Sequence, residues 1–86
     1  MFEVFFSPPV LRILDRADPP LRKKLDRCFE KLRRDPIHHN NIKRLTGEFA
    51  GLYRFRVGDW RVVYRINEQA RTIVVIDIGH RRDIYE

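Results

Sequence analysis

The stretch 53–64 constrains the fold of this chain most, because its pattern predicts a β-hairpin of fixed register. Gly58 and Asp59 form the two-residue turn, with glycine at the first position as a type II′ turn requires. Residues on the two strands then alternate between an apolar face and a basic face. The apolar face contains Tyr53, Phe55, Val57, Trp60, Val62 and Tyr64. The basic face contains Arg54, Arg56 and Arg61, and Arg65 lies further along the same strand.

The register of this hairpin places like charges opposite one another. Arg56 is expected to face Arg61, an arrangement that costs about 0.2–1 kcal/mol on the usual cross-strand scale. A fold tolerates this repulsion most easily where an anion lies between the two side chains. The basic face therefore predicts a phosphate site. The alternative, a solvated outer face of an ordinary antiparallel sheet, stays open at this point.

Two helices are predicted before the hairpin, each with a cap followed by two prolines. Ser7 and Asp18 are the expected N-caps, because their side chains accept a backbone hydrogen bond and proline is tolerated in the first turn. The helices are expected over 8–17 and 19–34, the second with one apolar stripe that includes Cys28. The short connection between them predicts a helical hairpin.

Four strands are predicted around these helices. A short, mostly buried strand covers 2–6, residues 37–51 are polar and irregular, and three strands follow at 52–57, 60–66 and 72–78. The last of these is nearly all apolar, as expected of a central strand. Short loops make the three a meander, to which the first strand adds on either side. The order β-α-α-β-β-β predicts a single α+β domain over 1–86, with the helical hairpin packed on one sheet.

The charge of the chain points to an acidic partner. The formal net charge is +6 and the sequence pI is about 10.1, which favours nucleic acid, an anionic membrane surface or an acidic protein. All four lysines come before Gly47, whereas the seven basic residues from there onward are all arginines. Arginine suits bidentate phosphate contacts and keeps its charge when partly buried. The predicted sheet thus carries arginine and the predicted helices carry lysine.

Other features are less informative. Cys28 is the only cysteine, and no secretory signal or membrane-spanning segment is recognisable, so a cytoplasmic protein without a membrane partner is expected. His38 and His39 lie without a carboxylate or thiol at ligand spacing, and no metal site is predicted there. The closing residues 79–86 combine His80, Arg81 and Tyr85 in a basic tail. Taken alone, this tail reads equally well as a solvated terminus.

Three segments together resemble the RelE/ParE superfamily of toxins, and its RelE-like branch in particular. They are 43–47, 52–64 and 79–85, and the likeness extends over essentially the whole chain. The resemblance implies the toxin of a type II toxin–antitoxin system, an endoribonuclease that cuts mRNA in the ribosomal A site. It implies attack of the ribose 2′-OH on the adjacent phosphate, without metal or other cofactor. The implied partners are a cognate antitoxin and the ribosome with its mRNA.

The resemblance also assigns residues to these roles. The expected catalytic residues are Arg56, Arg61, Arg81, Tyr85 and His80. The residues expected to contact RNA phosphates are Arg54, Arg65, Arg82, Lys43 and Arg44. The phosphate and its developing charge would be held by Arg56, Arg61 and Arg81.

One departure from the family pattern bears on the mechanism. RelE-type enzymes often have lysines where this chain has Arg54 and Arg56, and an arginine with a pKa above 12 is a poor general base. Tyr85 or His80 is therefore the expected proton acceptor from the 2′-OH. Two alternatives stay open: a ParE-like toxin that poisons DNA gyrase without nuclease chemistry, and an inactive RNA-binding relative.

Overall fold

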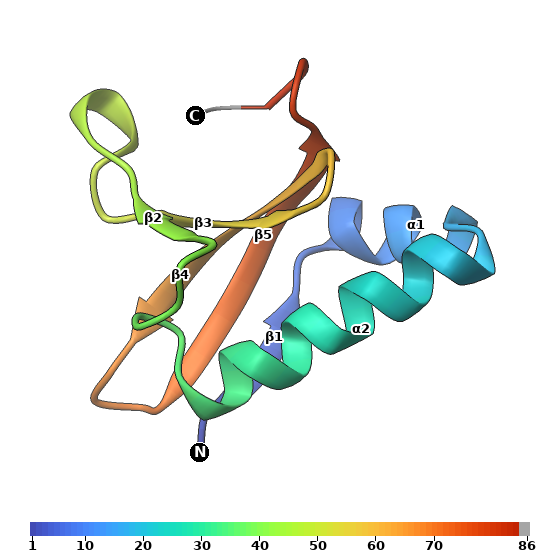
Figure 1. Cartoon of the computed structure of the whole chain (residues 1–86). Helices are drawn as coiled ribbons and strands as arrows, with labels where there is room; N and C mark the ends of the chain where they lie inside the picture. Colours follow the sequence, from blue (N-terminus) through green and yellow to red (C-terminus); the bar gives the residue numbers. More distant parts are fainter. Residues whose placement is uncertain (85–86) are drawn as a thin grey trace.

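The two helices cover one face of a five-stranded sheet and leave its other face without a helical layer (Figure 1). The computed structural model describes residues 1–84. Its elements are β1 (Glu3–Phe6), α1 (Pro8–Arg16), α2 (Pro19–Arg34), β2 (Ile42–Arg44), a 3₁₀ turn (Gly47–Phe49), β3 (Tyr53–Val57), β4 (Trp60–Asn67) and β5 (Thr72–His80). We call the sheet face opposite the helices the outer face.

The α+β class and the meander are confirmed, and the sheet gains one strand. The strand order is β1-β5-β4-β3-β2, with β1 parallel to β5 and all other neighbours antiparallel. The expectation of irregular chain over 37–51 was wrong for β2, whose Ile42 pairs with Phe55 and packs against the core. Because β2 contains Lys43, the sheet also carries a lysine. The apolar β5 is central, as predicted.

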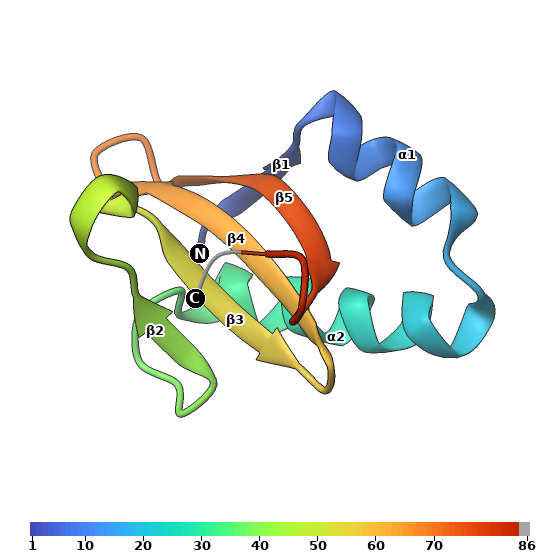
Figure 2. The ribbon, with the colours of Figure 1, turned by 90° about the horizontal axis from the view of Figure 1, so that it is seen from above.

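Both helix caps form as predicted. The Ser7 hydroxyl accepts from the Val10 N–H and donates to the Ile76 carbonyl at 3.1 Å, which ties the start of α1 to β5. The Asp18 carboxylate accepts from the Leu21 N–H at 3.1 Å. The helices diverge from their short connection (Figure 2). Each packs on the sheet through its buried residues, which are Val10 and Leu14 of α1 and Leu25, Phe29 and Leu32 of α2.

The core fills the space between the helices and the inner face of the sheet. Phe55, Val62 and Tyr64 are each 2% exposed or less and pack with Leu25 and Leu32 of α2. The Tyr64 hydroxyl donates to the Pro36 carbonyl at 2.7 Å, and burial raises the pKa of this phenol. The predicted apolar face of the hairpin is thus the sheet's contribution to the core.

β1 differs from its prediction in burial. It was expected to be mostly buried, but Phe5 is 48% exposed. β1 is an edge strand, and Phe5 pairs with Val74 on the outer face, where no helix covers either side chain. Within residues 1–84, neither helix is long and apolar enough to cross a membrane.

Candidate functional site

Three residues from neighbouring strands and one from the turn before β2 form one row across the outer face, near the β3–β4 turn. Arg56 and Arg61 are register partners, and Arg61 pairs in turn with Gly79 of β5. On the other side, the Asn41 carbonyl accepts from the Arg56 N–H at 3.0 Å. We call Asn41, Arg56, Arg61 and Gly79 the arginine row. The register predicted for the hairpin is confirmed at all five of its residue pairs.

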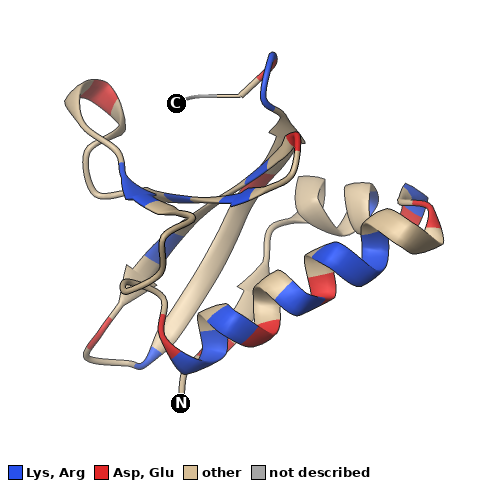
Figure 3. Ribbon diagram, in the orientation of Figure 1, with Lys and Arg blue, Asp and Glu red and all other residues tan. Residues whose placement is uncertain are grey.

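The turn of this hairpin has the backbone that the sequence predicted. Gly58 has a φ of 59°, which the first position of a type II′ turn requires, whereas Asp59 is not in the positive-φ region. This turn fixes Arg56 opposite Arg61. Figure 3 shows basic residues along β2, β3 and β4, in addition to those on α2.

Arg61 is the most enclosed member of the row, with 8% of its surface exposed. Its Nη1 donates to the carbonyls of Gly58 and Trp60, each at 3.0 Å. Burying a charged group is costly unless it is hydrogen-bonded, so these carbonyls offset part of the burial and fix one nitrogen of the guanidinium. Arg61 is therefore held in place before any ligand arrives, which is the condition for efficient stabilisation of developing charge.

Arg54 and Arg56 are oriented by Asn41, a residue that the sequence reasoning missed. The Arg54 Nη1 donates to the Asn41 carbonyl at 2.9 Å, and the Arg56 Nη2 donates to Asn41 Oδ1 at 3.4 Å. The Asn41 amide donates back to the Arg56 carbonyl at 3.0 Å. His39 Nδ1 accepts from the Asn41 N–H at 3.0 Å and so helps to place this loop. Two predicted site arginines thus donate to Asn41, Arg54 to its backbone carbonyl and Arg56 to its side chain.

The chain after β5 folds back over the outer face at the same end of the sheet (Figures 1 and 2). The Arg81 N–H donates to the Asp59 carbonyl at 2.8 Å, and Arg81 Nε lies 3.8 Å from Asp59 Oδ1. Ile84 lies on Gly79, where a Cβ atom would stand 3.2 Å from Ile84 Cδ1. A larger residue at this position would push Ile84 back by a few tenths of an ångström, so glycine helps the tail to approach the arginine row. Arg81 therefore reaches the turn that also holds Arg61.

His80 lies on the other face of the sheet. β5 continues to His80, which pairs with Trp60, and the two rings stand edge to face with centroids 5.9 Å apart. Because side chains alternate along a strand, His80 shares the helix side with buried Ile78, two residues earlier. The structure does not bring His80 together with Arg61, which contradicts the expectation that both serve one site.

The remaining predicted phosphate ligands are divided between the faces. Lys43 pairs with Arg54 on the outer face, in the row next to the arginine row. Arg44 pairs with Tyr53 on the helix side, where its Nη2 donates to the Tyr53 hydroxyl at 2.9 Å and this contact raises the pKa of Arg44. Arg65 is on the outer face, but it lies four positions along β4 from Arg61, a distance of about 13 Å.

Arg82 and Tyr85 are the last two predicted site residues, and Asp77 is a neighbouring residue that was not predicted. Arg82 is exposed, and its N–H donates to His80 Nδ1 at 3.4 Å. Tyr85 lies outside the described residues, so its predicted role stays a prediction. Asp77 was missed: it pairs with Val63 on the outer face, one row from Arg61, and its Oδ1 accepts from the Ile78 N–H at 2.9 Å.

The histidine loop carries polar contacts of its own. His38 Nδ1 lies 3.0 Å from Asp35 Oδ2, and the pKa of Asp35 is lowered mainly by the N–H of Ile37. Within residues 1–84, no three histidine, cysteine or acidic side chains are grouped so that they could hold a metal ion. The guanidinium groups near the arginine row supply charge and donors but no proton acceptor.

Comparison with known proteins places this geometry in a family. The family model for the ParE toxin of the type II toxin–antitoxin system parDE matches residues 4–85. The toxin RelG of Mycobacterium tuberculosis is 33% identical over 85 residues, covering 98% of this chain and 95% of that protein. The putative toxin RelE1 of Methanocaldococcus jannaschii is 33% identical over 87 residues, covering 99% and 96%. In the crystal structure of the toxin–antitoxin complex RelBE2 from M. tuberculosis, one chain is 30% identical with a TM-score of 0.80, covering 93% of this chain and 98% of that one.

Proposed function

Because the chain belongs to the ParE toxin family of type II toxin–antitoxin systems, within the RelE/ParE superfamily, we propose that it is a ribosome-dependent endoribonuclease. It cleaves mRNA in the ribosomal A site and so stops translation. The observation that carries this proposal is the arginine row, in which a buried and oriented Arg61 stands between an exposed Arg56 and the returning tail. A phosphodiester on this row meets positive charge from two strands.

The reaction is a transesterification. The ribose 2′ oxygen forms a bond to the adjacent phosphorus, the bond from phosphorus to the O5′ atom of the next nucleotide breaks, and a 2′,3′-cyclic phosphate remains. The proton of the 2′-OH passes to a base, and the O5′ leaving group takes a proton from solvent. Negative charge grows on the phosphoryl oxygens at the transition state, where oriented guanidinium groups have their largest effect.

Named residues divide this work. Arg61 and Arg56 stabilise the phosphoryl oxygens, Arg81 approaches from the tail, and Arg54 and Lys43 hold the neighbouring phosphate. Tyr85 is the proposed proton acceptor, since the arginines are poor general bases. The position of His80 on the helix side removes the support for His80 as an alternative base.

The proposed partners are the ribosome with its mRNA and a cognate antitoxin. The antitoxin follows from the RelBE2 complex of M. tuberculosis, which was crystallised as a toxin with its antitoxin. An acidic or amphipathic segment of such a protein would cover the basic outer face and block access of RNA. The proposed action on ribosomes and the proposed antitoxin partner support the cytoplasm as the proposed location.

The test is cleavage of mRNA on programmed ribosomes. We expect wild type to cut within the A-site codon, and Arg61→Gln to cut about a hundredfold more slowly or worse, as for loss of one oriented donor. Arg61→Lys keeps the positive charge but loses the planar guanidinium, so it distinguishes the effect of the charge from the effect of the guanidinium geometry. Tyr85→Phe tests the proton acceptor. Unchanged cleavage by Arg61→Gln would overturn the role given to Arg61. DNA damage with intact mRNA after expression in bacteria would replace this proposal with the gyrase alternative.

A further inference from the structure

A groove of about 210 Å³ lies between α2 and the end of β3, beside the outer face. Lys24, Arg27 and Lys31 line it from the helix. Asn41, Arg56 and Gly58 line it from the sheet side. Four basic side chains thus surround one narrow space, and the reaction proposed above uses only Arg56.

The helix that borders this groove separates its charges into two stripes. In the first stripe, Arg22 pairs with Asp26 at 3.1 Å and Arg33 pairs with Glu30 at 3.4 Å. The second stripe consists of Lys24, Arg27, Lys31 and Arg34, which follow one another at intervals of three or four residues along one side of the helix. We call it the α2 basic stripe. None of its members has an ion-pair partner among residues 1–84.

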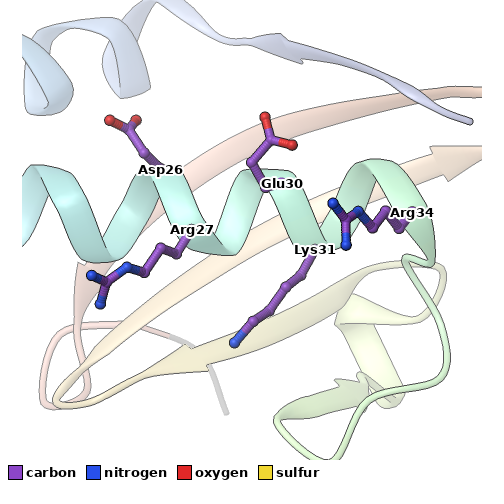
Figure 4. A pocket seen from close by; sticks show the side chains of 5 residues that line it. All are labelled: Asp26, Arg27, Glu30, Lys31 and Arg34. Atoms are coloured by element: carbon purple, nitrogen blue, oxygen red, sulfur yellow. The ribbon is translucent and has the colours of Figure 1, made fainter.

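Figure 4 shows how these side chains lie. Asp26 and Glu30 extend to one side of α2, and Arg27 and Lys31 extend to the other. A second hollow of about 390 Å³ lies on the exposed surface of the helix. Arg27 and Lys31 line both this hollow and the groove. The paired acids therefore do not neutralise the side of the helix that faces the groove.

The groove is continuous with the arginine row through Arg56, which belongs to both. An anion long enough to cross the outer face therefore meets further positive charge around the edge of β3. The groove offers little to a peptide partner, because Cys28 and Phe55 at its base are each only 2% exposed. The half-buried Val57 is the remaining apolar lining residue and is too small a surface to anchor a side chain. Charge without an apolar anchor suits a phosphate backbone.

Building on the function proposed above, we propose that this groove binds the phosphate backbone of RNA that adjoins the segment on the outer face. Lys24, Arg27 and Lys31 contact the phosphates, and Arg56 joins the two sites. The contact is independent of sequence, because the basic side chains bind phosphates and not base edges. It increases affinity for long RNA without taking part in the bond-breaking step.

The test uses 2′-O-methyl RNA, which lacks the attacking hydroxyl and so cannot be cleaved. Binding of fluorescein-labelled 5-nucleotide and 20-nucleotide strands is measured by anisotropy from 50 to 300 mM salt. The groove variant is Lys24→Gln/Arg27→Gln/Lys31→Gln, in which glutamine keeps a high helix propensity. The matched control is Arg12→Gln/Arg16→Gln/Lys23→Gln, which removes the same charge from exposed helical positions outside the groove.

We expect the groove variant to lose about two units of the slope of log K against log salt, since each single-strand phosphate contact contributes about 0.7. The preference for the 20-nucleotide strand should fall at least tenfold relative to the control variant. Equal losses in the two variants would overturn the proposal. So would equal binding of a 20-residue polyglutamate with the same dependence on Lys24, Arg27 and Lys31, which would make the groove a peptide site.

Two further measurements keep the outcome decisive. Thermal unfolding checks that both triple variants fold. If the triple groove variant does not fold, the single variants Arg27→Gln and Lys31→Gln replace it, and each should lose about 0.7 of the slope. Cleavage on ribosomes is scored separately. If the groove variant loses slope but the wild-type protein cuts no mRNA, the groove proposal stands and the nuclease proposal fails. If the wild type cuts mRNA but the groove variant has an unchanged slope, only the groove proposal fails.

Discussion

The two faces of the β3–β4 hairpin differ in what covers them and therefore in what their residues do. Toward the helices, Phe55, Val62 and Tyr64 are buried and packed. On the outer face, Arg56 is exposed, and Arg61 is hydrogen-bonded to the carbonyl of Gly58 in the turn. The strand partner of Arg61 is Gly79, which Ile84 of the tail covers. The same twelve residues thus supply core and site. Substitutions on the inner face should change stability, and those on the outer face should change chemistry.

The largest expected effect is on the inner face. Phe55→Ala removes a ring that is 2% exposed and should lower the free energy of unfolding by about 3–5 kcal/mol, since the cavity cannot collapse fully. This is a large part of the roughly 4–13 kcal/mol that a domain of this size has. Urea denaturation measures the loss. A decrease below 1 kcal/mol would show that the inner face does not carry the stability assigned to it.

The neighbouring outer-face residue should show the opposite pattern. Arg56→Gln should slow cleavage on ribosomes by about 10–100-fold, because a charge-assisted hydrogen bond to phosphate contributes about 1.5–3 kcal/mol. Its free energy of unfolding should stay within about 0.5 kcal/mol of wild type, as for an ordinary exposed position. Urea denaturation of the same samples provides the control. Full activity with reduced stability would reverse the roles of the two faces.

The assignment of hairpin residues to an inner and an outer face could largely be predicted from local sequence. The register of the hairpin followed from Gly58-Asp59 and strict alternation, and the helix starts followed from a cap and two prolines at Ser7 and Asp18. These signals act within a few residues. They do not depend on how distant parts of the chain meet, which is why the predictions based on them are confirmed.

The missed features depend on distant partners. β2 is three residues long, and only its pairing with β3 makes it a strand. Asn41 has no pattern of its own, because its role requires that pairing. His80 was expected in the tail beyond the strand, together with Arg81. Because β5 continues two residues beyond the predicted end, the alternation turns the His80 ring toward Trp60. The apolar run around Asp77 did hold one usable signal, a single carboxylate, which was passed over.

A smaller effect should separate orientation from charge at Asn41. Asn41→Ala removes the hydrogen bonds between the amide and Arg56, so cleavage should slow about 2–10-fold, corresponding to about 0.5–1.5 kcal/mol. Asn41→Asp restores an acceptor but adds a carboxylate that competes with phosphate for the guanidinium, so it should be slower still. Cleavage rates at saturating ribosomes compare the two. Faster cleavage by Asn41→Asp than by Asn41→Ala would refute the positioning role.

The smallest effect is expected at His80. His80→Gln should cleave at the wild-type rate within about twofold and should change the free energy of unfolding by about 0.5 kcal/mol or less, because its ring lies on the helix side at the strand end. A pH–rate profile of this variant should match that of wild type. A loss of tenfold or more, with a shifted profile, would return His80 to the site.

The central claim is that RNA phosphate binds the outer face at the arginine row. The most direct measurement is an NMR titration of the ¹⁵N-labelled protein with a 5-nucleotide 2′-O-methyl RNA, following backbone amides and arginine Nε–Hε signals. The account predicts the largest shifts at Arg54, Arg56, Arg61 and Gly79, with little change at Trp60 and His80 on the opposite face. Shifts confined to α1 or to the Trp60–His80 side would contradict it.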